Sequence, residues 1–344
     1  MCQYCFIVPK DVLIRLSEDT SLPDAARRNF AATATLDTAL RRVRAEAARM
    51  TQVSQALAPG VAAAVAAQPA ITVYDCHHAL TLPGVAVPNP ATAADPTAKR
   101  AYDTALKVAQ FYRDVFGRNS IDGSGMTIMS SVHFRTAYQN AFWNGAQMAY
   151  GDGDGALFID FTLGNDVIGH ELTHGVTQFS LQLNYTNDAG GINESMSDVF
   201  GSMFRQWLAG QTVAQADWLI GSDIMGPTAK ARGFTCLRDM ANPAAKHCLA
   251  AQPTTYSQIT KGMDPHYSSG IPNLAFAKAA NAIGGKSWEK AGKIWYQALT
   301  GFGPAPRMSM KKLALRTRTL AGQLFPAEPA VAQAVDRAWT DVGL

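Results

Sequence analysis

The sequence predicts an α+β protein with a β-rich half and a mainly helical half, preceded by a helical segment. Residues 71–75 form a β-branched run typical of a strand start, and residues 126–134 have the same character. From about residue 165 onward, apolar residues recur at helical spacing, in runs at 274–283, 288–299, 308–324 and 331–342. Residues 24–57 are rich in Ala and Arg, with Leu36, Leu40 and Val43 one helical turn apart. We therefore expect three parts, at residues 1–70, 71–180 and 181–344.

Composition excludes several classes of function. A length of 344 residues suggests about two domains, and a hydrophobic content of 47% is ordinary for a globular chain. The net charge of +3 is too small to argue for nucleic-acid or membrane binding. No apolar run approaches the 18 residues of a membrane span. The first residues lack a basic start and an apolar core, so we expect no Sec signal peptide, and either cytoplasmic retention or export by a non-Sec route.

The most informative stretch is residues 170–174, His-Glu-Leu-Thr-His. On a helix, His170 and His174 lie on one face one turn apart, where two imidazoles can hold one Zn²⁺. Glu171 between them can act on a water bound to the same ion. Two surface histidines are the alternative, but the small and apolar residues on either side, such as Gly169 and Gly175, suit a buried helix.

A hydrolytic zinc site needs a third protein ligand and an open fourth position. Residues 190–200, Gly-Gly-Ile-Asn-Glu-Ser-Met-Ser-Asp-Val-Phe, supply Glu194 and Asp198 four residues apart, so both carboxylates face the same way on a helix. One can bind the metal, and the other can accept the remaining N–H of a ligand histidine. Alone, this pattern would indicate only acidic residues near a helix start.

Together these motifs resemble the thermolysin family of zinc endopeptidases. Glu194 lies twenty residues after His174, and further blocks match at 140–145, 150–155, 237–240 and 266–273. The resemblance covers roughly residues 71–344. It implies the two-domain thermolysin-like fold, with the zinc helix between the halves at the floor of the cleft. It also implies a zinc-dependent neutral endopeptidase acting on peptides or proteins, with zinc held by His170, His174 and Glu194.

The resemblance assigns further site residues. Glu171 is the general base, Tyr185 and His266 donate to the oxyanion, and Asp198 orients a ligand histidine. The substrate main chain is bound by Asn140 and Ala141 on an edge strand, where an extended peptide adds as a further strand, and by Arg238. The apolar wall of the pocket after the scissile bond, formed by Phe158, Val167 and Leu237, implies cleavage before bulky hydrophobic residues. The family's orienting acid lies further upstream than Asp264, so the spacing leaves an Asp264–His266 pair unsupported.

Residues 1–70 resemble the short propeptide of the protealysin-like branch of this family. The Pro-Pro-Leu-like motif of that branch is represented by only one proline, Pro9. This implies a zymogen whose own pro-segment covers the cleft as an intramolecular inhibitor; a helical adaptor or a solvated tail is the alternative. New N-termini between residues 51 and 74 would mark maturation.

Five cysteines are too few and too scattered for a disulfide scaffold. One hypothesis has a thiolate from Cys2 or Cys5 reaching the open position of the catalytic zinc, with simple apolar packing as the alternative. Cys236 and Cys248 flank one loop and could pair in an oxidising compartment, whereas a reducing cytosol would keep them apart.

Calcium and two competing functions complete the expectations. Asp166 and Asp217 match two positions of the family's double calcium site, but Arg205, Leu219 and Ser222 stand where further acids are needed. Because Ca²⁺ requires six or more oxygen ligands, we predict that this double site is lost.

Two other functions remain as alternatives. A zinc aminopeptidase would need an acidic anchor for the substrate amine, but the edge strand has Asn-Ala-Phe-Trp at that place. A non-catalytic binding protein on the same scaffold is the remaining alternative.

Overall fold

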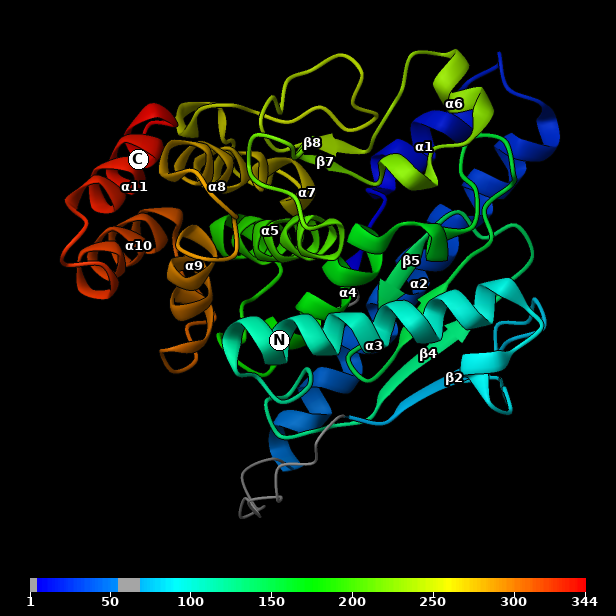
Figure 1. The fold of residues 1–344 in the computed structure, drawn as a ribbon. Coiled ribbons are helices and arrows are strands. Elements are labelled where there is room, and N and C mark those ends of the chain that lie inside the picture. The colour runs from blue at the N-terminus through cyan, green and yellow to red at the C-terminus, as the bar shows by residue number, and fades with distance from the viewer. Residues whose placement is uncertain (1–4, 55–68) are drawn as a thin grey trace.

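The computed structural model describes residues 5–54 and 69–344. Figure 1 shows two helices, α4 and α5, in the middle of the molecule, with a sheet on one side and a group of C-terminal helices on the other. This is the α+β arrangement predicted from the sequence. The expected low-complexity stretch at residues 61–67 and Cys2 lie outside the described residues, as do the side chains of residues 43–54. Within the described parts of the chain, no helix combines the length and apolarity needed to span a bilayer.

The main sheet has six strands in the order β1-β5-β6-β4-β2-β3. β2 pairs in parallel with β4, and β4 with β6, whereas β1–β5, β5–β6 and β2–β3 are antiparallel. The strands are β1 (Cys5–Phe6), β2 (Ile71–Asp75), β3 (Val85–Ala86), β4 (Ile128–Val132), β5 (Ala141–Trp143) and β6 (Met148–Tyr150). A second, two-stranded sheet pairs β7 (Leu219–Ile220) with β8 (Arg238–Asp239). The edge strand expected at Asn140 and Ala141 corresponds to β5, which forms a hairpin with β6 and is paired on its other side with β1 from the N-terminal segment.

Most helices begin and end close to the expected positions. The start of α3 is fixed by Asp95, which caps the helix by accepting hydrogen bonds from Thr97 and Ala98, and by Pro96 in its first turn. The α-helices are α1 (Lys10–Glu18), α2 (Asp24–Ser54), α3 (Pro96–Phe116), α4 (Asn165–Gln178), α5 (Asn187–Ala209), α6 (Pro227–Ala231), α7 (Pro265–Ser268), α8 (Gly270–Ile283), α9 (Ala291–Thr300), α10 (Met310–Leu324) and α11 (Pro329–Asp341). The described residues also form 3₁₀ turns, namely η2 (Pro90–Thr92), η3 (Phe161–Leu163), η4 (Ser222–Ile224) and η5 (Tyr256–Gln258).

Glycines let α4 and α5 approach closely enough to share one site. A Cβ added to Gly201 on α5 would lie 2.5 Å from the carbonyl oxygen of Asp166 and 3.0 Å from the backbone nitrogen of His170 on α4. A Cβ on Gly169 would in turn meet the Cα of Gly201 at 3.1 Å. Real Cβ atoms do not tolerate the shorter of these distances, so a side chain at residue 201 would push the two helices apart. The close crossing brings His170 and His174 within reach of Glu194.

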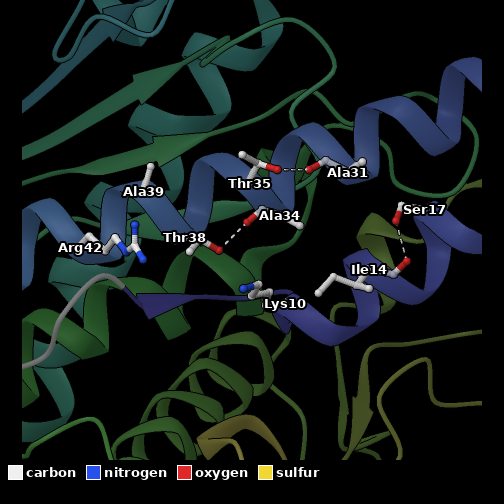
Figure 2. Close-up of a pocket in the computed structure, with 9 residues that line it drawn as sticks. All are labelled: Lys10, Ile14, Ser17, Ala31, Ala34, Thr35, Thr38, Ala39 and Arg42. Carbon is white, nitrogen blue, oxygen red and sulfur yellow. Dashed lines mark hydrogen bonds between the residues drawn. The ribbon is translucent and has the colours of Figure 1, made fainter.

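The N-terminal segment packs against both halves of the molecule. Beyond the β1–β5 pairing, Arg15 on α1 donates to the carbonyl of Leu249 at 2.6 Å. Arg232, which follows α6, forms an ion pair with Asp19 at the end of α1. A groove of about 760 Å³ lies between α1 and α2. Figure 2 shows that residues of these two helices line it, so it belongs to the N-terminal segment.

Candidate metal centre

His170, His174 and Glu194 converge on one point between α4 and α5. The two Nε2 atoms lie 3.0 Å apart. Glu194 places Oε2 at 3.4 Å from Nε2 of His170 and Oε1 at 3.5 Å from Nε2 of His174. All three side chains are fully buried. Donor atoms about 2.0–2.2 Å from a tetrahedral ion are separated from one another by roughly 3.3–3.6 Å, so these spacings fit a shared zinc ion.

The chemistry of the donor set also fits a metal ion. No described residue donates a hydrogen bond to Oε2 of Glu194. The imidazoles of His266 and His174 outweigh burial and hold the pKa of Glu194 well below its usual range, so its carboxylate is charged. A buried charged oxygen without a donor is costly unless a cation approaches it. The three residues therefore have the geometry and the charge that a divalent cation requires.

Both histidines are held by hydrogen bonds at their other ring nitrogen. Nδ1 of His170 lies 2.8 Å from Oδ1 of Asp198. Nδ1 of His174 lies 2.9 Å from Oδ1 of Asn193 and 3.0 Å from Oγ of Ser197. Such partners fix the ring orientation and leave Nε2 directed at the metal position. The role expected for Asp198 agrees with this geometry; Asn193 and Ser197 were not predicted, although both lie within three residues of Glu194.

Asp198 also joins the metal centre to β8, the strand that carries Arg238. Arg238 donates to both of its oxygens, from Nε at 2.9 Å and from Nη2 at 2.8 Å. Asn273 donates to Oδ2 at 2.8 Å. Burial would raise the pKa of Asp198, but the guanidinium of Arg238 and the imidazole of His170 lower it to about 2. This fork of two parallel hydrogen bonds fixes β8 relative to α5.

Glu171 lies beside the metal position, and its carboxylate has one fixed and one available oxygen. Oε2 accepts the backbone N–H of Trp143 on β5 at 2.9 Å, whereas no described residue donates to Oε1. Burial, aided by the negative charge of Glu194, raises the pKa of Glu171 well above its usual range. The carboxylate is therefore a stronger proton acceptor than an exposed one.

Tyr185 and His266 lie together next to Glu194. The hydroxyl of Tyr185 donates to Oε1 of Glu194 and lies 3.3 Å from Nε2 of His266. The pairing of Asp264 with His266, which the sequence spacing left unsupported, is present, because Oδ1 of Asp264 lies 2.6 Å from Nδ1 of that ring. Asp264 is the N-cap of α7 and also accepts the backbone N–H of His266. A cap residue two positions upstream can thus bind both the backbone and the side chain of His266.

The N-terminal segment runs through this site, extended in β1 and bent at Ile7 and Val8. Nε2 of His266 donates to the carbonyl of Phe6 at 2.6 Å. Ile7 donates its N–H to the carbonyl of Ala141 at 3.2 Å and accepts from Nη1 of Arg238 at 3.1 Å. The side chain of Asn140 both accepts from the N–H of Val8 at 2.9 Å and donates to its carbonyl at 3.1 Å.

The predicted pocket residues are buried together with this segment. Phe158, Val167 and Leu237 belong to the same cluster of buried apolar side chains as Ile7, which is fully buried. The sulfur of Cys5 also reaches the centre, since its Sγ and ligand atoms of His174 and Glu194 all lie within 4.8 Å of one another. Cys5 is disulfide-bonded, however, so it does not present the thiolate that the sequence hypothesis required.

Comparison with known proteins identifies this arrangement. A model of the thermolysin metallopeptidase catalytic domain matches residues 55–178, and one of the thermolysin metallopeptidase alpha-helical domain matches residues 181–344. An extracellular metalloprotease of Pectobacterium carotovorum is 38% identical over 284 residues, which span 79% of this chain and 80% of the relative. The chain belongs to the thermolysin family of metallopeptidases. A thermolysin from a Bacillus species is 36% identical over 80% of this chain and 51% of its own length.

A solved structure extends the likeness to the N-terminal segment. The precursor of protealysin, a metalloproteinase from Serratia proteamaculans, superposes with a TM-score of 0.83 at 35% identity and covers 98% of this chain and 99% of its own. The chain is thus a thermolysin-like metalloendopeptidase in precursor form, made as a zymogen. Membership of the family implies a catalytic zinc ion, which the donor set formed by His170, His174 and Glu194 fits.

Proposed function

We propose that this zymogen is kept inactive by its own residues 5–8, which are bound along the cleft in the manner of a substrate. The single observation that carries the proposal is the set of main-chain contacts of this segment. Each residue named above as a substrate-binding residue on sequence grounds, Asn140, Ala141 and Arg238, contacts the backbone of Ile7 or Val8. These hydrogen bonds involve only the main chain of the segment, so a peptide substrate can make the same ones.

The register of the bound segment supports the assignment of the reacting carbonyl. His266 donates to the carbonyl of Phe6, which places that oxygen where the oxyanion donors converge. The following residue, Ile7, then occupies the position after the scissile bond. Its side chain is fully buried in the main hydrophobic core, to which Phe158, Val167 and Leu237 also belong. An apolar pocket at this position supports cleavage on the N-terminal side of bulky hydrophobic residues.

The roles in the reaction follow from these positions. A zinc ion held by His170, His174 and Glu194 supplies Lewis-acid activation of a water and of the scissile carbonyl. Oε1 of Glu171 takes the proton of the attacking water and delivers it to the leaving nitrogen. His266 and Tyr185 donate hydrogen bonds to the oxygen that becomes negative. Asp264 accepts from Nδ1 of His266, so a donor at Nε2 requires the imidazolium form. Burial lowers the pKa of His266, but the carboxylates of Glu194 and Asp264 raise it above its usual value and so favour this form.

The experiment that tests the reaction compares wild type with Glu171→Gln, both freed of the N-terminal segment, on an internally quenched peptide blocked at its N-terminus. Loss of a general base costs about 10²–10⁴-fold in rate, so we expect a fall of that size in kcat with bound zinc unchanged. A blocked peptide excludes aminopeptidase action, because an aminopeptidase requires the free amine. Full activity of the variant would overturn the role of Glu171, and an inert processed wild type with zinc bound would overturn catalysis itself.

We also propose the division into a propeptide at residues 1–70, a catalytic half at 71–180 with the edge strand and zinc helix, and a helical half at 181–344. We further propose that the protein is exported, which is supported by the relative from Pectobacterium that is named an extracellular metalloprotease. Fractionation of a native culture with an antibody against the C-terminal half would test export, and retention of all the mature enzyme in the cells would count against it.

A further inference from the structure

A second group of metal-ligating side chains lies outside the catalytic cleft, on the segment that leads into and returns to β8. Cys236 and Cys248 face each other across an isolated parallel β-bridge. The two flanking backbone hydrogen bonds, Thr235 N–H to the carbonyl of His247 and Leu249 N–H to the carbonyl of Cys236, are both 3.0 Å long. The loop between them is thereby closed, and both sulfurs are buried at its base.

The distance between the two sulfurs distinguishes a shared ion from a disulfide. Sγ of Cys236 and Sγ of Cys248 lie 3.7 Å apart, and both cysteines are free thiols. A disulfide requires about 2.05 Å. Two thiolates each about 2.3 Å from a tetrahedral zinc ion lie about 3.8 Å apart. The observed separation therefore agrees with two ligands of one ion.

An imidazole and a carboxylate complete the group. A ring nitrogen of His247 and both sulfurs all lie within 4.8 Å of one another. The buried Nε2 of His247 makes no hydrogen bond of good geometry with a described residue, although Oδ2 of Asp239 lies 3.2 Å away. Oδ1 of Asp239 already accepts the backbone N–H groups of Ala241 and Asn242, both at 2.9 Å. Its other oxygen is thus positioned to restrain the ring, as carboxylates do at metal-binding histidines.

The donor types in this cluster also indicate which metal it would bind. Zinc binding would deprotonate both thiols, because the thiolate and not the thiol is the metal ligand. Two thiolates and an imidazole are soft donors that favour Zn²⁺ over the oxygen-seeking Ca²⁺ and Mg²⁺.

We propose that Cys236, His247 and Cys248 bind a second, structural Zn²⁺, with Asp239 as a positioning residue beside the imidazole. The ion would tie the two ends of the loop together immediately before Leu237 and Arg238. Arg238 contacts both Asp198 and the carbonyl of Ile7. The second zinc therefore stabilises the strand that presents the pocket wall and the main-chain donor, while the reaction itself takes place elsewhere.

The test is metal analysis of the full chain, purified without chelators, with matched variants. We expect about two zinc ions per wild-type chain, and about one in the double variant Cys236→Ser/Cys248→Ser. His170→Ala is the matched control, because it should lose the other ion and keep this one. Cobalt substitution adds a readout independent of activity: the thiolate-to-cobalt charge-transfer absorption should persist in Cys5→Ser and disappear in the double variant.

Thiol counting on the wild type keeps the proposal testable even if the double variant does not fold. Under non-reducing denaturation with a chelator present, Cys236 and Cys248 should both be alkylated, and a peptide map should identify them. A disulfide between these two cysteines would overturn the proposal. A single zinc ion per wild-type chain, lost entirely in His170→Ala, would overturn it as well.

Discussion

Replacing Ile7 by alanine tests whether the pro-segment is held as a bound substrate. Ile7 is fully buried, its N–H and carbonyl are engaged by Ala141 and Arg238, and its side chain packs in the main apolar cluster. The substitution keeps both main-chain hydrogen bonds and removes only the buried side chain. Truncating a buried isoleucine to alanine costs about 2–5 kcal/mol. At about 1.4 kcal/mol per tenfold change, the fraction of chains with an open cleft should rise roughly 30-fold to several thousand-fold.

The assay is the initial rate of peptide hydrolysis by freshly purified, unprocessed zymogen, with processing followed by mass spectrometry. Ile14→Ala on α1 is the matched control, because Ile14 is 38% exposed and its truncation should leave the rate within about twofold. Circular dichroism would confirm that the variants are folded. A basal rate for Ile7→Ala equal to those of wild type and Ile14→Ala would refute the substrate-like binding of this segment.

Three further predictions concern pH, processing and calcium. Asp37 on α2 is buried against the catalytic half, where it accepts from Tyr138 and, at 2.9 Å, from Asn140; burial raises its pKa to about 7 from 3.8. The docked state thus binds its proton more tightly, so docking is strongest below pH 4 and weakens as the pH rises towards 7. The rate of maturation should rise as the pH increases from about 4 to 7. Asp37→Asn should flatten this pH dependence of the maturation rate, whereas the control Asp24→Asn, at an exposed residue, should leave it unchanged. An unchanged pH profile for Asp37→Asn would contradict the prediction. N-terminal sequencing of matured protein should find a new terminus between residues 51 and 74, and termini elsewhere would count against the zymogen boundary. Elemental analysis should find fewer than two calcium ions per chain, because Arg205 pairs with Asp217 at 2.9 Å and lies 3.5 Å from Asp223, and two or more would contradict the lost double site.

The metal centre could be predicted from sequence because its geometry is mostly local. Four residues separate His170 from His174, and four separate Glu194 from Asp198, so helical periodicity alone assigns each pair to a face. The relative placement of α4 and α5 rests on the contact between Gly169 and Gly201, which spacing does not reveal. The family resemblance supplied that information, and the convergence of all three ligands agrees with it.

Contacts between distant segments were the least predictable part. Asp37 is an ordinary helix residue in the sequence, and only the docking of α2 against Tyr138 and Asn140 makes it a buried acid. The backbone N–H of Trp143 that holds Glu171 has no sequence signature at all. The pairing of Asp264 with His266 could not be predicted from the family spacing, because it depends on the local geometry of a helix cap.

The pairing of β1 with β5 has a consequence for what the mature enzyme can digest. When the N-terminal segment leaves, the outer side of β5 loses its neighbour and offers free backbone donors and acceptors. Only a polypeptide stretch whose own amides are not already engaged in a helix or a sheet can satisfy them. Unfolded chains, flexible linkers and frayed chain ends should therefore be cleaved readily. Tightly folded proteins should resist cleavage until they unfold locally.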